Sequence, residues 1–574
     1  MSTVAEMLVE CLVENEVTHV WGVVGDALNP VTDAIHRNDG ISWMGVRHEE
    51  AGAFAAGAQS QLTGRLGVCM GTVGPGSIHL LNGLYDAKKT GASVLAICGQ
   101  VPSPEMGSDF FQEVDNDALF ADVADFRATV TSADQFHGLL EQAGNAALQH
   151  GGVAVLTLPG DIGGLDLPKH TPVPKFVVEQ PVVQPSHEAI AAAAAAINEA
   201  DRVTMLVGCG ARGARKEVLA MAERLSAPIV LTIKAKEELE RDNPYQVGQS
   251  GLLGNHASAI AFDGCDVLLM VGTDFPYTEF YPSGKVVVQI DANSQHIGRR
   301  HPVDHAVVAD AQAALTALSG LVEPHRDTSL LDDARKSYQR WQGRQHRLTD
   351  PDFAHKPQGL LRRHVDNPDA RIRPELPAAV VNRLADPDTI FTTDTGMATV
   401  WLSRFVEMTG QRRLLGSFNL GSMANAMPQA LGAQALDRNR QVVAFCGDGG
   451  LTMLLGDLIT AVTHDLPVKL LVFNNGSLGM VKLEMEQVGL APSGTQLDNP
   501  DLAAVARAIG LHGVRVEDPH DVEQAVRESL AHPGPALIDV VTNPDEIAIP
   551  PKPTLKQGWG FAIAKSKEFL DSPE

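Results

Sequence analysis

The sequence predicts an α/β protein with three consecutive units, each built on a doubly wound parallel sheet. Short apolar runs alternate with helical patterns of apolar residues, which is typical of parallel strands covered by helices on both faces. A chain of 574 residues is too long for one hydrophobic core, so three or four domains are expected. Glycine-rich or acidic turns follow several apolar runs, at the edge where open α/β sheets bind ligands.

The first unit is expected at residues 1–170. Its apolar runs have the length of buried strands, and Ala51–Leu62 between two of them has a helical pattern. The expected strands are His19–Val24, Ile41–Val46, Leu66–Val73, Ser93–Cys98 and Val153–Leu158. Prolines from Pro168 to Pro185 then indicate an extended linker, and Ser186 is a suitable N-cap for the alanine-rich helix Ile190–Ile197.

The second unit is expected at residues 186–323 and the third at 375–545. Strands of the second unit are expected at Val203–Val207, Ile229–Thr232, Val267–Val271 and Val286–Ile290. Residues 324–374 between the two units are polar and show little periodicity, so we expect a connecting segment on the surface, and residues 546–574 form a C-terminal tail. The first and third units are similar in size and style, without a convincing sequence repeat.

Composition excludes several classes of function. The net charge of −25, with no basic stretch to offset it, argues against nucleic-acid binding. The six cysteines are scattered in apolar patterns, which is typical of buried thiols in a reducing compartment. The N-terminus lacks the regions of a signal peptide, and no apolar stretch is long enough to span a bilayer. We therefore expect a cytoplasmic protein.

The most informative motif pairs Gly447-Asp448-Gly449 with Asn474-Asn475. Each closes an apolar run, and the segment between them has helical spacing, so both lie at carboxyl ends of neighbouring strands. The glycines allow backbone amides to approach a diphosphate, and Asp448 and the Asn475 side-chain oxygen are hard ligands suited to Mg²⁺. Alone, Gly-Asp-Gly could equally be a strand-ending turn, but the spaced pair within a β-α-β frame favours a ligand site.

This pair resembles the diphosphate–magnesium motif of the thiamine-diphosphate enzymes. The resemblance implies that Asp448, Asn475 and the Ser477 carbonyl hold Mg²⁺, with Gly449 and Gly450 against the diphosphate. Met423 matches the position whose apolar side chain wedges beneath the thiazolium, although methionine also fits ordinary core packing. The remaining implied thiamine-diphosphate contacts are Gly421, Ser422, Gly476, Leu478, Gly479, Met480 and Val481.

In the first unit, Glu49 lies where a strand is expected to end and a helix to begin. An acid at a helix N-terminus complements the macrodipole without any catalytic role. The family resemblance implies instead that Glu49 hydrogen-bonds the aminopyrimidine ring and helps form the imino tautomer that takes the thiazolium proton, a task for a buried, tuned acid.

Two further segments of this unit fit the resemblance. The turn Gly71–Gly76 brings backbone and His79 close to a ligand, although His79 fits a histidine satisfied by its helix neighbours equally well. Phe110-Phe111-Gln112-Glu113 resembles a substrate-site segment of pyruvate-oxidising members, with Gln112 in the place of their active-site glutamine.

The middle unit resembles the FAD-contacting domain of the pyruvate oxidase and quinone-dependent pyruvate dehydrogenase group. Three segments at expected strand ends carry this resemblance, where ordinary turns of an α/β domain are the alternative. Their implied FAD contacts are Ser250, Gly251, Leu252, Leu253, Thr273, Asp274, Phe275, Pro276, Tyr277 and Asp291. Lys234-Ala-Lys236 departs from the family, which usually has glycine before the lysine, so contacts with the flavin there differ.

The resemblance therefore implies oxidative decarboxylation of pyruvate to acetate and CO₂, with thiamine diphosphate, Mg²⁺ and FAD as cofactors and a quinone such as ubiquinone as acceptor. The alternatives are an oxygen-dependent pyruvate oxidase, an acetolactate-synthase-like carboligase, and a catalytically silent scaffold. The family resemblance also implies that the protein assembles as a homodimer or homotetramer. Because the tail after Gly560 is short, we expect at most weak peripheral contact with the inner face of the cell membrane.

Overall fold

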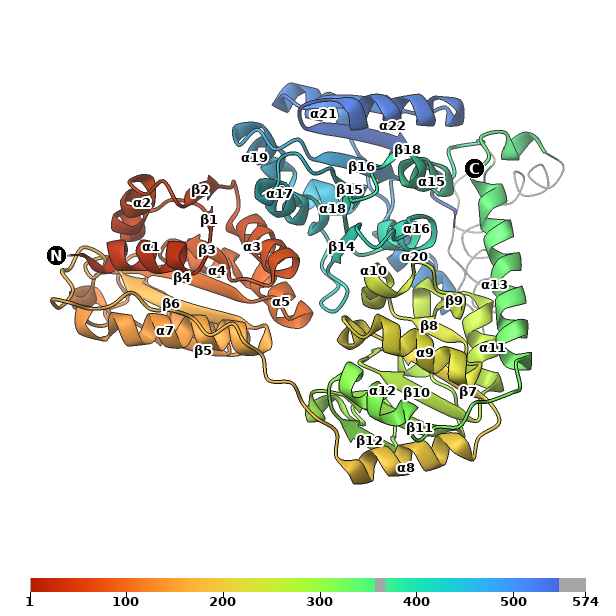
Figure 1. The fold of residues 1–574 in the computed structure, drawn as a ribbon. Coiled ribbons are helices and arrows are strands. Elements are labelled where there is room, and N and C mark those ends of the chain that lie inside the picture. Colours follow the sequence, from red (N-terminus) through yellow and green to blue (C-terminus); the bar gives the residue numbers. More distant parts are fainter. Residues whose placement is uncertain (1, 357–366, 368, 547–574) are drawn as a thin grey trace.

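The computed structural model describes residues 2–356, 367 and 369–546, and it contains three parallel six-stranded sheets (Figure 1). The expected α/β class with three doubly wound units is confirmed. The first sheet has the order β2-β1-β3-β4-β6-β5 and the third has the order β14-β13-β15-β16-β18-β17, so the two match strand for strand. The expectations for the tail fall, apart from Glu546, outside the described residues.

In the first unit, helices cover both faces of the sheet, and their buried side chains form one core on each side. The strands are β1 (His19–Gly22), β2 (Ser42–Gly45), β3 (Gly67–Gly71), β4 (Val94–Gln100), β5 (Phe126–Thr129) and β6 (Val153–Pro159). The helices are α1 (Val4–Glu14), α2 (Asn29–His36), α3 (Glu49–Thr63), α4 (Pro75–His79), α5 (Leu81–Thr90), α6 (Asn116–Leu119) and α7 (Ala133–His150).

The middle unit follows an extended stretch with no helix or named strand between β6 and α8, as the prolines predict. Ser186 caps α8 by accepting a hydrogen bond from the Ala189 amide. The strands are β7 (Val203–Val207), β8 (Ile229–Leu231), β9 (Gln246–Gln249), β10 (Val267–Val271), β11 (Val286–Asp291) and β12 (His305–Val308). The helices are α8 (His187–Asn198), α9 (Arg215–Leu225), α10 (Lys236–Leu239), α11 (His256–Gly264) and α12 (Ala311–Ser319).

The third unit carries the predicted diphosphate motif at the carboxyl edge of its sheet. The strands are β13 (Ile390–Thr393), β14 (Arg413–Gly416), β15 (Val442–Gly447), β16 (Lys469–Asn474), β17 (His512–Val516) and β18 (Ala536–Val541). The helices are α15 (Glu375–Leu384), α16 (Met397–Phe405), α17 (Ala426–Leu436), α18 (Asp448–Met453), α19 (Leu458–Thr463), α20 (Gly479–Gln487), α21 (Leu502–Ile509) and α22 (Val522–Ala531).

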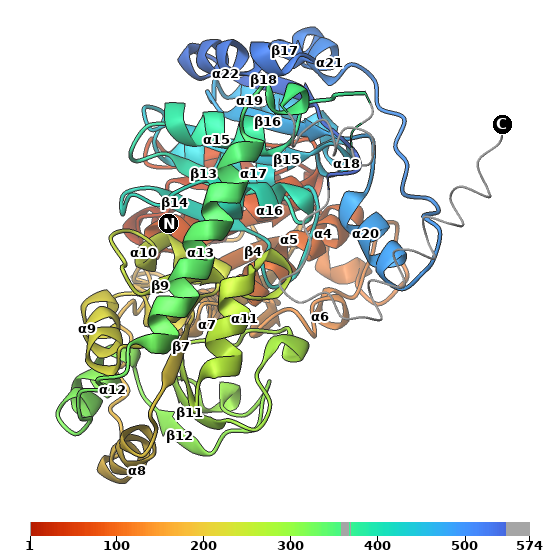
Figure 2. The same cartoon turned by 90° about the vertical axis from the view of Figure 1, so that its right-hand side faces the viewer.

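The segment between the second and third units corrects one expectation. Residues 324–374 were expected to form a surface connection of little periodicity, but they contain the 20-residue helix α13 (Ser329–Leu348). The apolar residues of α13 lie at helical spacing, at Leu330, Ala334, Tyr338 and Trp341. Of these, Ala334 and Tyr338 pack in a hydrophobic cluster of the middle unit. In Figures 1 and 2, α13 runs along one side of the molecule from the middle unit to the third.

The first and third units share a core through α3 and α17. Both helices are rich in alanine and glycine, so their backbones approach closely, and a Cβ on Gly432 would lie 2.3 Å from the Ala55 carbonyl oxygen. The Gln59 side-chain amide also donates to the Gly432 carbonyl at 3.0 Å. None of the helices within the described ranges combines the length and apolar character that a membrane span requires.

Candidate active site

The third sheet reverses its winding between β13 and β15, and a cavity of about 230 Å³ opens beside their carboxyl ends. A crevice of this kind is where open α/β sheets bind ligands. The structure brings most of the predicted thiamine-diphosphate residues to this cavity. Its lining includes Gly421, Met423, Asp448, Gly449, Gly450, Asn475, Ser477, Leu478, Gly479, Met480 and Val481.

The two motifs are joined directly through Asp448, which begins α18. One carboxylate oxygen accepts from the Gly449 amide at 2.8 Å, and the other accepts from the Gly476 amide at 2.7 Å and from Asn499 at 2.8 Å. Burial raises the pKa of Asp448, and these hydrogen bonds partly offset that rise. The carboxylate is therefore held beside the Asn475 turn, where the Asn475 side-chain oxygen accepts from the Ser477 amide at 3.0 Å.

The donor set at this edge fits the expected ions and phosphates. A buried carboxylate, an amide oxygen and a carbonyl oxygen are the hard ligands that Mg²⁺ prefers. Two predicted residues, Ser422 and Gly476, do not line the cavity but form hydrogen bonds next to it. The Ser422 hydroxyl accepts from Asn82 of the first unit at 2.9 Å, and the Gly476 amide donates to Asp448. The terminal methyl of Met423 would lie 3.2 Å from a Cβ on Gly449, so this side chain lies against Gly449.

Sequence reasoning missed Asp394, whose carboxylate contacts the glycine turn that follows β15. It is buried at the end of β13, and its carboxylate accepts from the Ala426 amide at 2.9 Å and from the Gly447 amide at 3.1 Å. Burial raises its pKa to about 7, against the effect of these amides. A Cβ on Gly450 would lie 2.4 Å from its Oδ2, so glycine is required there. The acid following an apolar strand was the available signal.

The carboxyl edge of the first sheet gathers the other predicted catalytic side chains. Glu49 begins α3 and is 6% exposed, and its Oε2 lies 2.9 Å from Nδ1 of His79 in α4. The His79 ring stacks on His48 with 4.4 Å between the ring centroids. A Cβ on Gly76 would come within 3.2 Å of the other Glu49 oxygen, so the predicted turn brings the backbone against this carboxylate.

Gln112 lies at the same edge, against the turn that precedes α4. Its backbone has a φ of +67°, an uncommon conformation for a residue other than glycine. Gly74, itself at φ +67°, faces it, and a Cβ there would lie 2.8 Å from the Gln112 carbonyl oxygen. Glu113 holds the loop by accepting from the amides of Gly107 and Phe110. Strain at such a residue is typical of functional loops.

The cavity beside Asp448, which we call the diphosphate cavity, is lined by no described residue of the first unit. Every described residue that lines it lies between Pro374 and Glu546. Within this chain, therefore, the Glu49 edge and the Asp448 cavity are not two walls of one pocket.

The middle sheet has the order β9-β8-β7-β10-β11-β12, which is the 3-2-1-4-5-6 order of dinucleotide-binding folds. Its crevice lies between β7 and β10. The turn after β7 is Gly208-x-Gly210-x-x-Gly213, a fingerprint that sequence reasoning missed although it follows a strand and precedes a helix. A Cβ on Gly208 or Gly272 would lie within 2.4 Å of backbone atoms of the opposite turn, so two turns meet closely at the crevice.

The predicted FAD residues occupy the strand ends of this sheet. Ser250, Gly251, Leu252 and Leu253 follow β9, and Thr273 to Tyr277 follow β10. Thr273 is buried, and its hydroxyl has no hydrogen-bond partner within the described residues. An orphaned hydroxyl beside a glycine cradle fits a polar ligand such as a dinucleotide.

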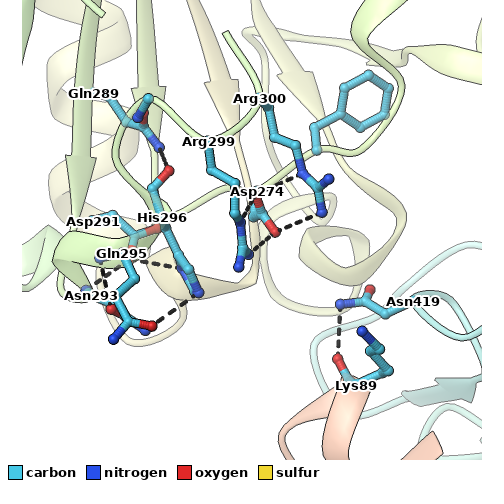
Figure 3. A network of polar contacts seen from close by, with 12 residues as sticks. Lys89, Asp274, Gln289, Asp291, Asn293, Gln295, His296, Arg299, Arg300 and Asn419 are labelled. Carbon is cyan, nitrogen blue, oxygen red and sulfur yellow. Dashed lines mark hydrogen bonds and ion pairs between the residues drawn. The ribbon is translucent and has the colours of Figure 1, made fainter. Parts of the chain in front are cut away.

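Asp274 and Asp291 anchor the network in Figure 3. Asp274 accepts from both Arg299 and Arg300, with 3.0 Å between Arg300 Nε and Oδ1. Burial raises the pKa of Asp274, but the two guanidinium groups outweigh it and hold the pKa below its usual value. Asp291, at the end of β11, accepts from the Asn293 amide at 2.9 Å and lies 3.2 Å from His296.

The unusual Lys234-Ala-Lys236 segment points its side chains elsewhere. Lys236 is buried and pairs with Glu240 one helical turn later. Lys234 reaches the Thr90 carbonyl oxygen of the first unit at 3.4 Å. The two lysines thus serve contacts inside and between units.

Comparison with known families matches each unit in order. The N-terminal TPP binding domain of thiamine pyrophosphate enzymes matches residues 2–119, the central domain 190–318 and the C-terminal TPP binding domain 394–540. The chain belongs to the thiamine pyrophosphate enzyme family. It is therefore a thiamine-diphosphate-dependent enzyme, and the Asp448 cavity lies within the matched C-terminal binding domain.

Several relatives cover nearly the whole chain at similar identity. The thiamine pyrophosphate-containing protein YdaP of Bacillus subtilis is 34% identical over 99% of this chain and 96% of its own length. A pyruvate oxidase of Lactiplantibacillus plantarum is 31% identical over 92% of this chain and 87% of its own. An acetolactate synthase large subunit of Parasynechococcus marenigrum is 30% identical over 96% of this chain and 89% of its own. The relatives thus include both an oxidase and a carboligase.

Proposed function

We propose that the protein oxidatively decarboxylates pyruvate to acetate and CO₂, with water supplying the added oxygen of acetate, and transfers the two electrons through FAD to a quinone. The observation that carries the proposal is a second candidate binding site, the crevice of the middle unit, in addition to the diphosphate cavity of the third unit. The middle sheet combines the dinucleotide-binding strand order, closely meeting glycine turns and the orphaned Thr273 hydroxyl. The pyruvate oxidase relative, which covers most of this chain, is in line with this assignment.

The residues of the chain have distinct roles in this proposal. Asp448, Asn475 and the Ser477 carbonyl would hold Mg²⁺, and the glycines after β15 would receive the diphosphate through their amides. Bound thiamine diphosphate would supply an electron sink for the electron pair that remains on the former keto carbon when CO₂ leaves. Glu49 would hold and move a proton at the aminopyrimidine, and His79, whose Nδ1 lies 2.9 Å from the Glu49 carboxylate, would orient it. Gln112 would orient the substrate carboxylate.

We further propose that the active unit is a homodimer, or a homotetramer formed as a dimer of dimers. The Asp448 cavity is lined by the third unit alone, and the Glu49 edge belongs to the first. A closed two-fold pair would bring the first unit of one protomer to the third unit of its partner twice over. Each active site would then contain residues of both protomers.

Two other activities use the same fold. A carboligase of the acetolactate synthase kind is favoured by the relatives of that name, and it would leave the flavin with no net redox change. An oxygen-dependent oxidase would use O₂ as the acceptor and, with phosphate in place of water, release acetyl phosphate. These alternatives differ from the proposal in where the electrons go.

The deciding experiment is anaerobic addition of pyruvate to the protein reconstituted with thiamine diphosphate, Mg²⁺ and FAD. We expect loss of the oxidised flavin absorption, with acetate as product, and rapid recovery on adding a water-soluble ubiquinone analogue. Flavin that stays oxidised while acetolactate accumulates would favour the carboligase. Fast recovery with air and slow recovery with the quinone would favour the oxygen-dependent oxidase.

A further inference from the structure

A second cavity, of about 520 Å³, lies where α13 meets the third unit. Its walls are the C-terminal half of α13, the outer face of α15, the end of α16 and the 3₁₀ turn η10 (Pro519–Asp521). It shares no lining residue with the diphosphate cavity. Its volume is in the range of sites for small organic ligands.

Arg404 is a charged group in the wall of this cavity with no ion-pair partner among the described residues. Its guanidinium lies over the Trp341 ring at 5.7 Å, but it forms no hydrogen bond or ion pair with any residue in the described ranges, and its Nε is buried. Burial lowers the pKa of Arg404 to about 10, so it remains protonated at neutral pH. A buried Nε–H without a hydrogen-bonding partner is costly, and a bound anion would remove that cost.

Glu375 is the acid that interacts with Arg404, but no hydrogen bond or ion pair joins the two side chains within the described residues. Burial and the neighbouring Glu546 raise the pKa of Glu375 well above its usual value, which disfavours the charged form of this acid. Charges at the rim are already paired: Arg383 with Glu523 at 2.7 Å, and His520 with Asp352 at 3.0 Å. The exposed Glu407 faces water. Among the described residues, the Arg404 guanidinium is thus a positive group in the interior wall that no hydrogen bond or ion pair satisfies.

Gln345 provides a second group without a partner. It lies on α13 one turn after Trp341, and its buried Oε1 accepts no hydrogen bond from the described part of the chain. Because buried polar atoms are normally hydrogen-bonded, we expect a ligand here to donate a hydrogen bond to Gln345 Oε1. Leu376, Val380 and Phe405 give the remaining wall an apolar character. The lining thus fits a ligand that has an anionic group, an adjacent hydrogen-bond donor and an apolar portion.

We propose that this cavity is an effector site for a small carboxylic acid that carries a hydroxyl or amino group beside the carboxylate and an apolar side chain. The carboxylate pairs with Arg404, the donor binds Gln345 Oε1, and the apolar body lies against α15 and Trp341. The helix α16 makes the site an effector site, because Met397 at its start lines the diphosphate cavity and Arg404 at its end lines this one. The inference does not depend on which reaction the enzyme catalyses.

The test uses 3-phenyllactate as the probe, with 3-phenylpropionate and the methyl ester of phenyllactate as matched compounds. Calorimetry on the full chain should show one phenyllactate bound per protomer. The propionate, which lacks the hydroxyl, should bind about 10-fold more weakly because Gln345 stays unpaired, and the ester, which lacks the charge, more weakly still. Intrinsic fluorescence should change on binding in the parent and in Trp401→Phe, but not in Trp341→Phe.

Arg404→Met should weaken phenyllactate binding at least 10-fold, whereas Arg383→Met, at the paired and exposed rim, should bind within about 3-fold of the parent. If Arg404→Met does not fold, Gln345→Met on the surface helix should abolish the preference for phenyllactate over phenylpropionate. Bound phenyllactate should also shift the affinity for thiamine diphosphate. Absence of binding to the parent, or equal binding by Arg404→Met, would overturn the site. Binding with unchanged thiamine-diphosphate affinity would overturn the effector role.

Discussion

Replacing Gly450 with alanine separates helix propensity from packing at the diphosphate cavity, because the two predict opposite signs. Gly450 lies in α18, where alanine in place of glycine would ordinarily stabilise a helix by up to about 1 kcal/mol. The added Cβ, however, would lie 2.4 Å from Asp394 Oδ2 and 2.8 Å from its Cγ. Both distances are far inside van der Waals contact.

Asp394 cannot yield without further loss. Its carboxylate is fixed by the amides of Ala426 and Gly447, and a lost hydrogen bond costs about 1 kcal/mol. Overpacking adds about 1–3 kcal/mol. After subtracting the gain in helix propensity, we expect Gly450→Ala to destabilise the third unit by about 2 kcal/mol. The distorted turn should also bind thiamine diphosphate about 10-fold more weakly.

The assay is thermal unfolding of the apoprotein, followed by calorimetric titration with thiamine diphosphate and Mg²⁺. For a unit of this size, the expected loss corresponds to a fall in melting temperature of about 4–8 °C. Gly456→Ala is the matched control, because its Cβ would meet only Arg47, at 4.0 Å. A melting temperature for Gly450→Ala equal to or above that of the parent would refute the packing argument.

Further predictions concern the acid, the metal ligand, assembly and pH. Glu49→Gln should fold and retain FAD but lose about 10²–10⁴-fold in kcat, and near-normal turnover would remove Glu49 from its proposed role. Asp448→Ala should lower Mg²⁺-dependent affinity for thiamine diphosphate by about 100-fold or more in calorimetry, while an unchanged affinity would place the metal elsewhere. Activity should be lost in step with dissociation when the protein is diluted, as followed by mass photometry, and a fully active monomer would contradict the shared site. Burial lowers the pKa of His19 to about 4, with Arg438 and His464 adding to the effect. Because the folded pKa is depressed, its contribution is present above pH 6.5 and is lost as the pH falls towards 4. His19→Gln should therefore lose less stability over this range, by up to about 3 kcal/mol in urea titrations, and an unchanged pH profile would contradict this.

How far the fold could be predicted depended on burial along each strand. Central strands such as β4 and β10 are buried throughout, so they appear in the sequence as unbroken apolar runs. The edge strands β5 and β12 are partly exposed and carry mixed polarity, and they were not predicted. The helix α13 was also missed, because only one narrow stripe of its surface is apolar and the rest is charged.

Site residues were predictable where the chemistry requires a recognisable local pattern. Asp448 and Asn475 follow adjacent strands, and Glu49 begins a helix at a strand end, so each could be placed from the sequence. Asp394 also follows a strand, but this signal alone does not distinguish it, because its role comes from contacts with Gly450 and Ala426, which are distant in sequence. The glycine fingerprint at Gly208 was local and could have been found.

The central claim is that electrons from pyruvate leave through a flavin bound in the middle unit. The most direct measurement is the flavin spectrum during anaerobic titration with pyruvate, in the parent and in Glu49→Gln. The account predicts stoichiometric flavin reduction in the parent, reduction slowed by about 10²–10⁴-fold in the variant, and reoxidation on adding a quinone. A flavin that remains oxidised in the parent while pyruvate is consumed would contradict it.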